Sequence, residues 1–224
     1  MEPWFQAVRW TLFPALRVWF RWRFEGLEHI PARGPAIIAC NHASYLDPPA
    51  TAYAVVRAHR RPRFLAKQEL FRAPGLKWVM KGAHQIPVAR GTGTQGASLV
   101  AANEALARGE IVVVYPEGTV TKREDGLPMQ GKTGTVRLAL ASGVPITPMV
   151  SWGSAPVWQK SGPGSLRPGR PVWIRVGTPI DLSERGVSTE DHDGVDALTA
   201  ELMDVLTREV TALRDVYPAR WAAR

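Results

Sequence analysis

Residues 36–47 read AIIACNHASYLD. The first five of these residues are apolar or small, which is typical of a buried strand. His42 stands two positions after that run, and Asp47 stands five positions beyond His42. A general base needs a rigid support and a fixed ring orientation, and a nearby carboxylate can hold one imidazole nitrogen while the other accepts a proton. The segment therefore predicts a strand that ends in a candidate catalytic pair, His42 and Asp47.

The same residues also have a purely structural explanation. Asp47 precedes Pro48-Pro49, and an aspartate followed by proline is a common way to begin a helix. His42 would then be an ordinary loop histidine. The two explanations are compatible, because an aspartate at a helix start can also reach back to the loop before it.

Short apolar runs recur along the chain and alternate with helical patterns. The runs are rich in β-branched residues and lie at 37–40, 111–115, 146–150 and 172–176. Helices are expected at 49–58, 96–108, 133–142 and 196–214, and a loop at 153–171. Strands that alternate with helices predict an α/β fold, with a largely buried central sheet flanked by helices. A chain of 224 residues suits one domain of this kind, which we place at residues 25–224.

The first 24 residues differ from the rest in composition. They hold eight of the nineteen aromatic residues, with Arg9, Arg17, Arg21 and Arg23 among them. The longest uncharged stretch is far shorter than the roughly 20 residues that a membrane-spanning helix needs, and the pattern does not fit a signal peptide. Aromatic residues mixed with arginine favour an interfacial helix, or a helix pair divided at Pro14, on the membrane surface. The alternative is a helix packed on the core of the domain.

The net charge of +8 is concentrated in one region. Residues 57–90 contain nine Lys or Arg and one acid, Glu69, whereas residues 181–224 are net acidic. A basic region attracts anionic lipids, nucleic acid or acidic substrates, although it can also be a plain solvated surface. No nucleic-acid-reading motif is present. The single cysteine, Cys40, excludes an internal disulfide and fits a reducing compartment, and no His or Cys spacing predicts a metal site.

Two further stretches carry candidate binding residues. Tyr115-Pro-Glu-Gly-Thr119 follows the most apolar strand, and strand ends are where α/β proteins place their ligands. Lys122, Arg123 and Lys132 follow closely and favour an anion there. Arg90 precedes Gly91-Thr92-Gly93 and has the fork geometry that suits a phosphate, although a surface arginine beside a turn is also expected to look like this.

The order of these stretches resembles the glycerolipid acyltransferases of the 1-acylglycerol-3-phosphate acyltransferase type. The motif Asn41-His42-x4-Asp47 corresponds to the first of the four sequence blocks of that family. The stretches at 86–90, 115–119 and 144–148 follow in the family's order. The resemblance covers roughly residues 24–180, and its first block is the specific one.

The resemblance implies transfer of a fatty acyl group from acyl-CoA or acyl carrier protein to a lysoglycerophospholipid, with no cofactor. His42 would be the general base and Asp47 its orienting partner. The acceptor's glycerol phosphate would be bound by residues of the second and third blocks and nearby lysines, namely Arg90, Glu117, Gly118, Thr119, Lys122 and Lys132. The expected location is the cytoplasmic face of the membrane, as a peripheral or monotopic protein.

The chain departs from the family pattern at two positions. The third block commonly continues with arginine, where this chain has Val120, and the second commonly has an acid before its arginine, where this chain has Ala89. Either Lys122, Arg123 or Lys132 replaces the missing arginine, or the acceptor has another headgroup. Two rival functions remain open: a thioester or ester hydrolase, and a non-catalytic basic membrane-binding protein.

Overall fold

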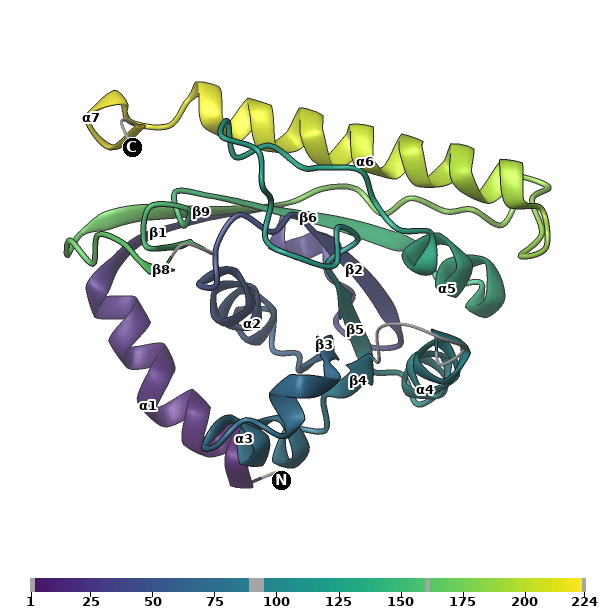
Figure 1. The fold of residues 1–224 in the computed structure, drawn as a ribbon, viewed down its shortest axis with the longest axis horizontal. Helices are drawn as coiled ribbons and strands as arrows, with labels where there is room; N and C mark the ends of the chain where they lie inside the picture. Colours follow the sequence, from purple (N-terminus) through teal and green to yellow (C-terminus); the bar gives the residue numbers. More distant parts are fainter. Residues whose placement is uncertain (1–2, 89–94, 160–161, 223–224) are drawn as a thin grey trace.

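The structure, a computed structural model, describes residues 3–88, 95–159 and 162–222. A seven-stranded sheet runs through the molecule in the order β1-β9-β6-β2-β5-β3-β4 (Figure 1). Neighbouring strands are parallel except β6 and β9, which are antiparallel. The strands are β1 (Phe20–Glu25), β2 (Ala36–Cys40), β3 (Pro62–Lys67), β4 (Ile86–Val88), β5 (Ile111–Val114), β6 (Ile146–Trp152) and β9 (Arg170–Val176). The expected α/β fold with a buried central sheet is confirmed.

Helices cover both faces of this sheet (Figure 1). One face carries α1 (Pro3–Trp19), α2 (Asp47–Arg57) and α3 (Leu76–Gly82). The other face carries α4 (Gln95–Ala107), α5 (Gly134–Ser142) and α6 (His192–Asp215). Smaller elements are the 3-10 helices η1 (Leu27–His29) and η2 (Gln68–Phe71), the hairpin of β7 (Trp158–Gln159) and β8 (Gly162–Pro163), and α7 (Ala219–Ala222).

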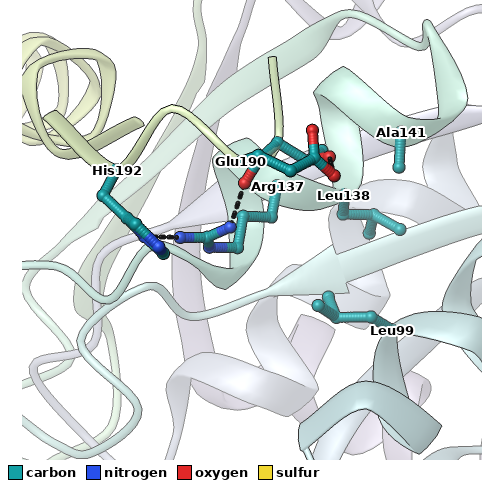
Figure 2. A pocket seen from close by; sticks show the side chains of 7 residues that line it. Leu99, Arg137, Leu138, Ala141, Glu190 and His192 are labelled. Atoms are coloured by element: carbon teal, nitrogen blue, oxygen red, sulfur yellow. Dashed lines mark hydrogen bonds between the residues drawn. The ribbon is translucent and has the colours of Figure 1, made fainter. Parts of the chain in front are cut away.

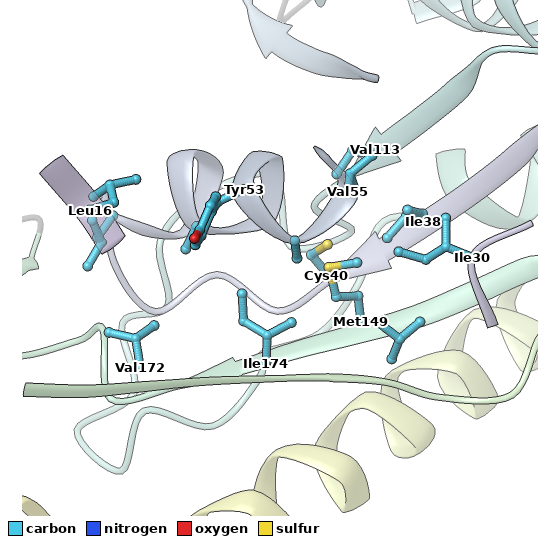
Figure 3. Close-up of a cluster of buried hydrophobic side chains, with 14 of the residues drawn as sticks. Leu16, Ile30, Ile38, Cys40, Tyr53, Val55, Val113, Met149, Val172 and Ile174 are labelled. Carbon is cyan, nitrogen blue, oxygen red and sulfur yellow. The ribbon is translucent and has the colours of Figure 1, made fainter. Parts of the chain in front are cut away.

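The central strand β2 is buried on both faces, which explains why its sequence is uniformly apolar. Ile38 and Cys40 join the hydrophobic cluster under α2, where Tyr53 and Val55 also lie (Figure 3). Ile37 and Ala39 point to the opposite cluster, which α4, α5 and α6 cover. The strand is therefore a fixed platform for the residues that follow it.

The N-terminal segment is shorter as a helix than the sequence predicted. Helix α1 is a single helix that contains Pro14 and ends at Trp19. The expectation that residues 20–24 belong to the helical segment is wrong, because Phe20–Glu25 forms β1 and pairs in parallel with β9. Phe, Trp and Phe alternate with arginine there, a period of two that is typical of a strand, and the aromatic residues pack into the cluster around Tyr53.

Strands β3 and β4 carry no clear apolar run in the sequence, which is why they were not expected. In β3, Arg63 is almost fully buried and pairs with Glu110 at 3.2 Å, so a polar residue occupies a core position. Within the described residues, no helix is both long enough and apolar enough to cross a membrane.

Candidate active site

His42 lies where the chain leaves the sheet in two opposite directions. After β2 the chain passes to α2 on one face, and after the adjacent strand β5 it passes to α5 on the other face (Figure 1). In open α/β sheets, ligands bind at the carboxyl ends of such a strand pair. His42 follows β2 and the turn at 115–119 follows β5, so the two sequence-predicted stretches meet at this edge.

His42 and Asp47 are in contact. The distance between His42 Nδ1 and Asp47 Oδ2 is 3.2 Å. The Asp47 side chain is fully buried, whereas 12% of the His42 side chain remains exposed. A carboxylate held against Nδ1 leaves Nε2 as the nitrogen that can accept a proton, which is the arrangement a general base needs.

Asp47 is also the centre of a larger hydrogen-bond network. Its Oδ2 accepts hydrogen bonds from the backbone N–H groups of Ala43 at 2.6 Å and Ser44 at 2.7 Å. Its Oδ1 accepts from the hydroxyls of Ser151 at 3.1 Å and Ser154 at 2.6 Å. A carboxylate surrounded by donors keeps one orientation. Asp47 therefore presents a fixed oxygen to His42, and the aspartate at the helix start does reach back to its preceding loop.

The two serines come from the end of β6 and the turn beyond it. Gly153, between them, has a φ of +94°, and a side-chain carbon there would lie 2.3 Å from the carbonyl oxygen of Pro171. Only glycine fits that position, because it tolerates positive φ and has no Cβ. The turn at Gly153 thus brings Ser154 back toward Asp47.

Asn41 fixes the start of the His42 loop. Its amide nitrogen donates to the carbonyl of Ser151 at 3.1 Å, and its side-chain oxygen accepts from the Ser151 N–H at 2.8 Å. The Asn41 side chain therefore bonds to the backbone of β6 as a neighbouring strand would, and so extends the pairing of β2 with β6 by one residue.

The ring of Tyr115 packs against the imidazole of His42, with the centroids 4.4 Å apart and the planes inclined by 32°. Its hydroxyl is within 3.1 Å of the Thr51 hydroxyl, and burial raises its pKa well above the ordinary value. Tyr115 thus acts as a neutral wall that limits the rotation of the imidazole.

Glu117 connects this loop to the next. Its Oε1 accepts from the backbone N–H of His42 at 3.0 Å, and its Oε2 accepts from the N–H of Met129 at 3.0 Å. Burial raises the pKa of the Glu117 carboxyl, while these two backbone donors oppose that shift. Both oxygens are occupied, so the carboxylate holds the turn in place next to His42.

The other predicted binding residues surround this turn. Gly118 has a φ of +65°, and a side-chain carbon built on it would lie 3.4 Å from the end of the Lys132 side chain. Lys122 and Lys132 are exposed, and Thr119 is half-buried. Arg123 is already engaged by Asp125, with nitrogen–oxygen distances of 2.9 and 2.6 Å. Arg90 lies outside the described residues.

Four residues of the site had no assigned role in the sequence. Asn41 and Tyr115 stood inside the quoted motifs, but their types did not reveal which contacts they make. Ser151 ends β6, and Ser154 lies in the stretch expected to be a loop. Serine in a Gly- and Pro-rich stretch carries no local signal, because its partner Asp47 is more than 100 residues away.

Two cavities lie apart from His42. The first has a volume of about 360 Å³ and is bordered by apolar side chains, namely Leu99, Leu138 and Ala141. Arg137 and His192 also line it, with 2.9 Å between Arg137 Nη2 and His192 Nδ1 (Figure 2). The second, about 490 Å³, lies between the loop at 128–131 and α6. Neither cavity is lined by His42 or Asp47.

Neither a metal nor a thiol chemistry is indicated by the described residues. Within 3–88, 95–159 and 162–222, no group of three or more His, Cys, Asp or Glu side chains is placed to hold a metal ion. Cys40 is 2% exposed, and burial raises the pKa of its thiol far above the ordinary value. Cys40 is a core residue, as its apolar context predicted.

Comparison with known proteins places this geometry in a family. The chain is 29% identical over 179 residues to the chloroplastic 1-acyl-sn-glycerol-3-phosphate acyltransferase LPAT1 of Arabidopsis thaliana, covering 79% of this chain and 47% of the relative. It is 29% identical over 157 residues to the 1-acyl-sn-glycerol-3-phosphate acyltransferase of Bacillus subtilis, covering 70% and 72%. The chain thus spans about half the length of the plant relative.

A solved structure agrees with the sequence relatives. The crystal structure of the 1-acyl-sn-glycerophosphate acyltransferase PlsC from Thermotoga maritima has a TM-score of 0.69 and 26% identity to this chain. The match covers 96% of this chain and 78% of the PlsC chain. The sequence profile described as Acyltransferase matches residues 21–152, more than half of the chain. On these grounds, the protein belongs to the acyltransferase family.

Proposed function

We propose that this protein transfers a fatty acyl group from acyl-CoA or acyl carrier protein to the hydroxyl of a lysoglycerophospholipid. The acceptor that the relatives' names favour is 1-acylglycerol-3-phosphate, and the product would be phosphatidic acid. The observation that carries the proposal is the contact of 3.2 Å between His42 Nδ1 and Asp47 Oδ2 at the carboxyl end of β2. The proposed chemistry requires no cofactor.

In the proposed mechanism, His42 acts as general base and Asp47 as its orienting partner. Asp47 accepts the Nδ1 proton in a hydrogen bond, so Nε2 carries the lone pair. Nε2 removes the proton from the acceptor hydroxyl as that oxygen attacks the thioester carbonyl carbon. When the tetrahedral intermediate collapses, the carbon–sulfur bond breaks and the imidazolium returns the proton to the leaving thiolate. Asp47 stabilises the imidazolium between the two steps.

The acceptor is proposed to bind at the turn beside His42. Lys122 and Lys132 supply the positive charge, together with the hydroxyl of Thr119 and the half-buried turn at Gly118. Glu117 serves the acceptor through the shape of this turn, since its carboxylate oxygens are bonded to His42 and Met129. Arg90 keeps its proposed role as a further phosphate contact. Val120 is 3% exposed and faces the core, so it offers the acceptor no contact, and the two lysines are proposed to take the role of the arginine common at this position.

Membrane association is proposed to use α1 and α3, which lie side by side (Figure 1). Trp10 on α1 is 71% exposed and Trp78 on α3 is 55% exposed. Each indole has a cation nearby: Arg9 Cζ lies 5.7 Å from the Trp10 ring and Lys77 Nζ lies 5.2 Å from the Trp78 ring. Exposed tryptophans beside cations suit the headgroup layer. A peripheral position on the cytoplasmic face is the location we propose.

A thiol-release assay separates the proposed function from its rivals. Purified protein is mixed with acyl-CoA, with and without lysolipid, and free thiol is measured. Thiol release only with lysolipid supports transfer, release without it supports a hydrolase, and no release supports a non-catalytic binding protein. His42→Ala should lower kcat by about 10²–10⁴-fold, the usual contribution of a general base. Activity near that of the wild type would remove His42 from this role.

The membrane surface can be tested without cutting the chain, since truncation at residue 24 would also remove β1. We expect the double variant Trp10→Ser/Trp78→Ser to partition into anionic vesicles about tenfold less, because two large side chains no longer leave water. Val100→Ser on α4, which removes an equally exposed apolar residue on the opposite face, is the matched control. If the two variants sedimented equally with vesicles, the proposal that α1 and α3 bind the membrane would be refuted.

A further inference from the structure

Arg170, the first residue of β9, is a buried cation without a matching anion. Its residue exposure is 5%, and its Nε and Nη1 have no hydrogen-bond partner. Among the described residues, no carboxylate forms an ion pair with it. Burying a charged group without acceptors is costly, and most buried donors in proteins are paired. The Nε and Nη1 atoms of the guanidinium therefore lack an acceptor, although the Tyr217 hydroxyl forms a hydrogen bond with the same side chain.

Trp221 on α7 supplies a third unpartnered donor at the same place. Its Nε1 is also buried without a hydrogen-bond partner. The Trp221 ring centroid lies 5.0 Å from Arg170 Cζ and 4.8 Å from Arg167 Cζ. One indole thus contacts two guanidinium groups, an arrangement that concentrates positive charge near N–H groups without acceptors.

The surroundings add more positive charge. A side-chain carbon built on Gly169 would lie 3.6 Å from Arg21 Nε, so this guanidinium borders the same turn. Arg21 and Arg167 are exposed and, like Arg170, form no ion pair with a described carboxylate. Three arginines without acidic neighbours favour an anion as the missing ligand.

The rim of this cluster is apolar and exposed. Val18, Trp19 and Leu166 are 85%, 42% and 58% exposed. The turn before β9 is tied to the end of α1, because Trp19 Nε1 donates to the Leu166 carbonyl at 2.8 Å and Gly169 N–H donates to the Trp19 carbonyl at 2.7 Å. A fixed apolar rim around a basic centre matches a lipid, whose phosphate meets the arginines while its chains meet the rim.

We propose that Arg170, Arg167 and Trp221 form a binding site for the phosphate group of an anionic glycerophospholipid of the membrane. The oxygens of the phosphate would accept hydrogen bonds from the unpartnered nitrogen atoms, which suit the fork geometry of arginine. Because those atoms are buried, entry of the ligand requires the four-residue helix α7, which carries Trp221, to shift outward.

This site is separate from the acyl-transfer site, although both lie at the same edge of the sheet. Strand β9 begins at the edge where β2 ends, because β6 is parallel to β2 and antiparallel to β9. Strand β6 separates the two in the sheet order. The site adds a contact for a lipid headgroup to the proposed membrane association. It does not depend on any step of the proposed acyl transfer.

The test is a titration of the whole chain with soluble probes, followed through the indole ¹H–¹⁵N resonance that Trp221→Phe removes. The probes are dihexanoyl phosphatidylglycerol, dihexanoyl phosphatidylcholine and inorganic phosphate. We expect phosphatidylglycerol to shift this resonance at the lowest concentration. Inorganic phosphate binding as tightly as the lipid would overturn the lipid source, and phosphatidylcholine binding as tightly would overturn the preference for an anionic lipid.

Variants locate the site. Arg170→Met and Arg167→Gln should each weaken phosphatidylglycerol binding about tenfold, the usual effect of losing hydrogen bonds to a charged group. Arg33→Gln, an exposed arginine before β2 at the opposite edge, is the matched control and should bind as the wild type does. Arg167 is exposed, so Arg167→Gln keeps the test valid if Arg170→Met fails to fold. Equal affinity of Arg167→Gln and Arg33→Gln would overturn the proposal.

His42→Ala serves to separate this site from the catalytic one. We expect His42→Ala to bind phosphatidylglycerol with unchanged affinity, whatever its transferase activity. A loss of lipid binding in His42→Ala would mean that the probe occupies the acyl-transfer site, which would refute a second site.

Discussion

Asp47 and Arg170 are both buried charges at the same edge of the sheet, and their surroundings are opposite. Asp47 has four hydrogen-bond donors and the imidazole of His42 around its two oxygens. Arg170 has two nitrogen atoms without any acceptor. The protein compensates the first charge with its own atoms and compensates the second only in part, through the Trp221 ring and the Tyr217 hydroxyl. A buried charge that is internally satisfied orients other groups, whereas one that is unsatisfied marks a place for a ligand.

The sharpest test of the Asp47 side of this comparison is Asp47→Asn. The amide can keep the contacts, because the hydroxyls of Ser151 and Ser154 can turn to accept from it, but the negative charge is lost. We expect kcat to fall by about 10³-fold or more, as when a histidine loses its charged orienting partner. The measurement is steady-state thiol release with lysolipid, with circular dichroism to show that folding is intact. A kcat within tenfold of the wild type would contradict the orienting role.

A smaller effect is expected from removing one donor to Asp47. Ser154→Ala deletes the hydroxyl at 2.6 Å and should lower kcat about tenfold, while KM changes little, because the hydroxyl positions Asp47 and is not proposed to touch substrate. Ser151→Ala, with the longer contact of 3.1 Å, should lower kcat less.

Ser98→Ala is the matched control for these serine variants. Ser98 is another buried hydroxyl, which donates to the Pro87 carbonyl at 3.0 Å, away from His42. We expect Ser98→Ala to lower the melting temperature as Ser154→Ala does, but to leave kcat unchanged. If Ser98→Ala reduced kcat as much as Ser154→Ala, the effect would be one of stability and not of position.

The smallest expected effect is on the Arg170 side, and its sign differs. Replacing Arg170 by an apolar residue of similar length removes the cost of burying its charge, and this gain offsets the lost contacts with Trp221 and Tyr217. We therefore expect Arg170→Met to change the free energy of unfolding by at most about 1 kcal/mol, or to raise it, in the absence of lipid. Thermal or denaturant unfolding measures this difference. A loss of several kcal/mol would show that Arg170 is satisfied inside the protein, and the contrast with Asp47 would disappear.

Much of the site was visible in the sequence because the motif is local. His42 and Asp47 are five positions apart, and the apolar run before them is typical of the buried strand that the structure shows. The neighbouring turn at 115–119 was also visible, since it follows another such run. Strands and turns that depend on nearby residues can be predicted from the local pattern of apolar residues.

The N-terminal segment shows where such local reasoning fails. Residues 20–24 were predicted as helix because aromatic and arginine residues also suit an amphipathic helix, yet they form the edge strand β1. The preference for a strand came from β9, 150 positions away in the sequence, which offers a parallel partner. Pairing with a distant strand overrides a local preference.

The sequence alone determined the α/β class, the central strand and the His42–Asp47 pair, because each depends on apolar periodicity and short spacing. Only the tertiary structure decided that Ser151 and Ser154 bond to Asp47, that Glu117 ties His42 to Met129, and that two nitrogen atoms of Arg170 are buried without an acceptor. These contacts join residues far apart in the chain, and a hydrogen bond depends on distance and angle in space, which spacing along the sequence does not specify.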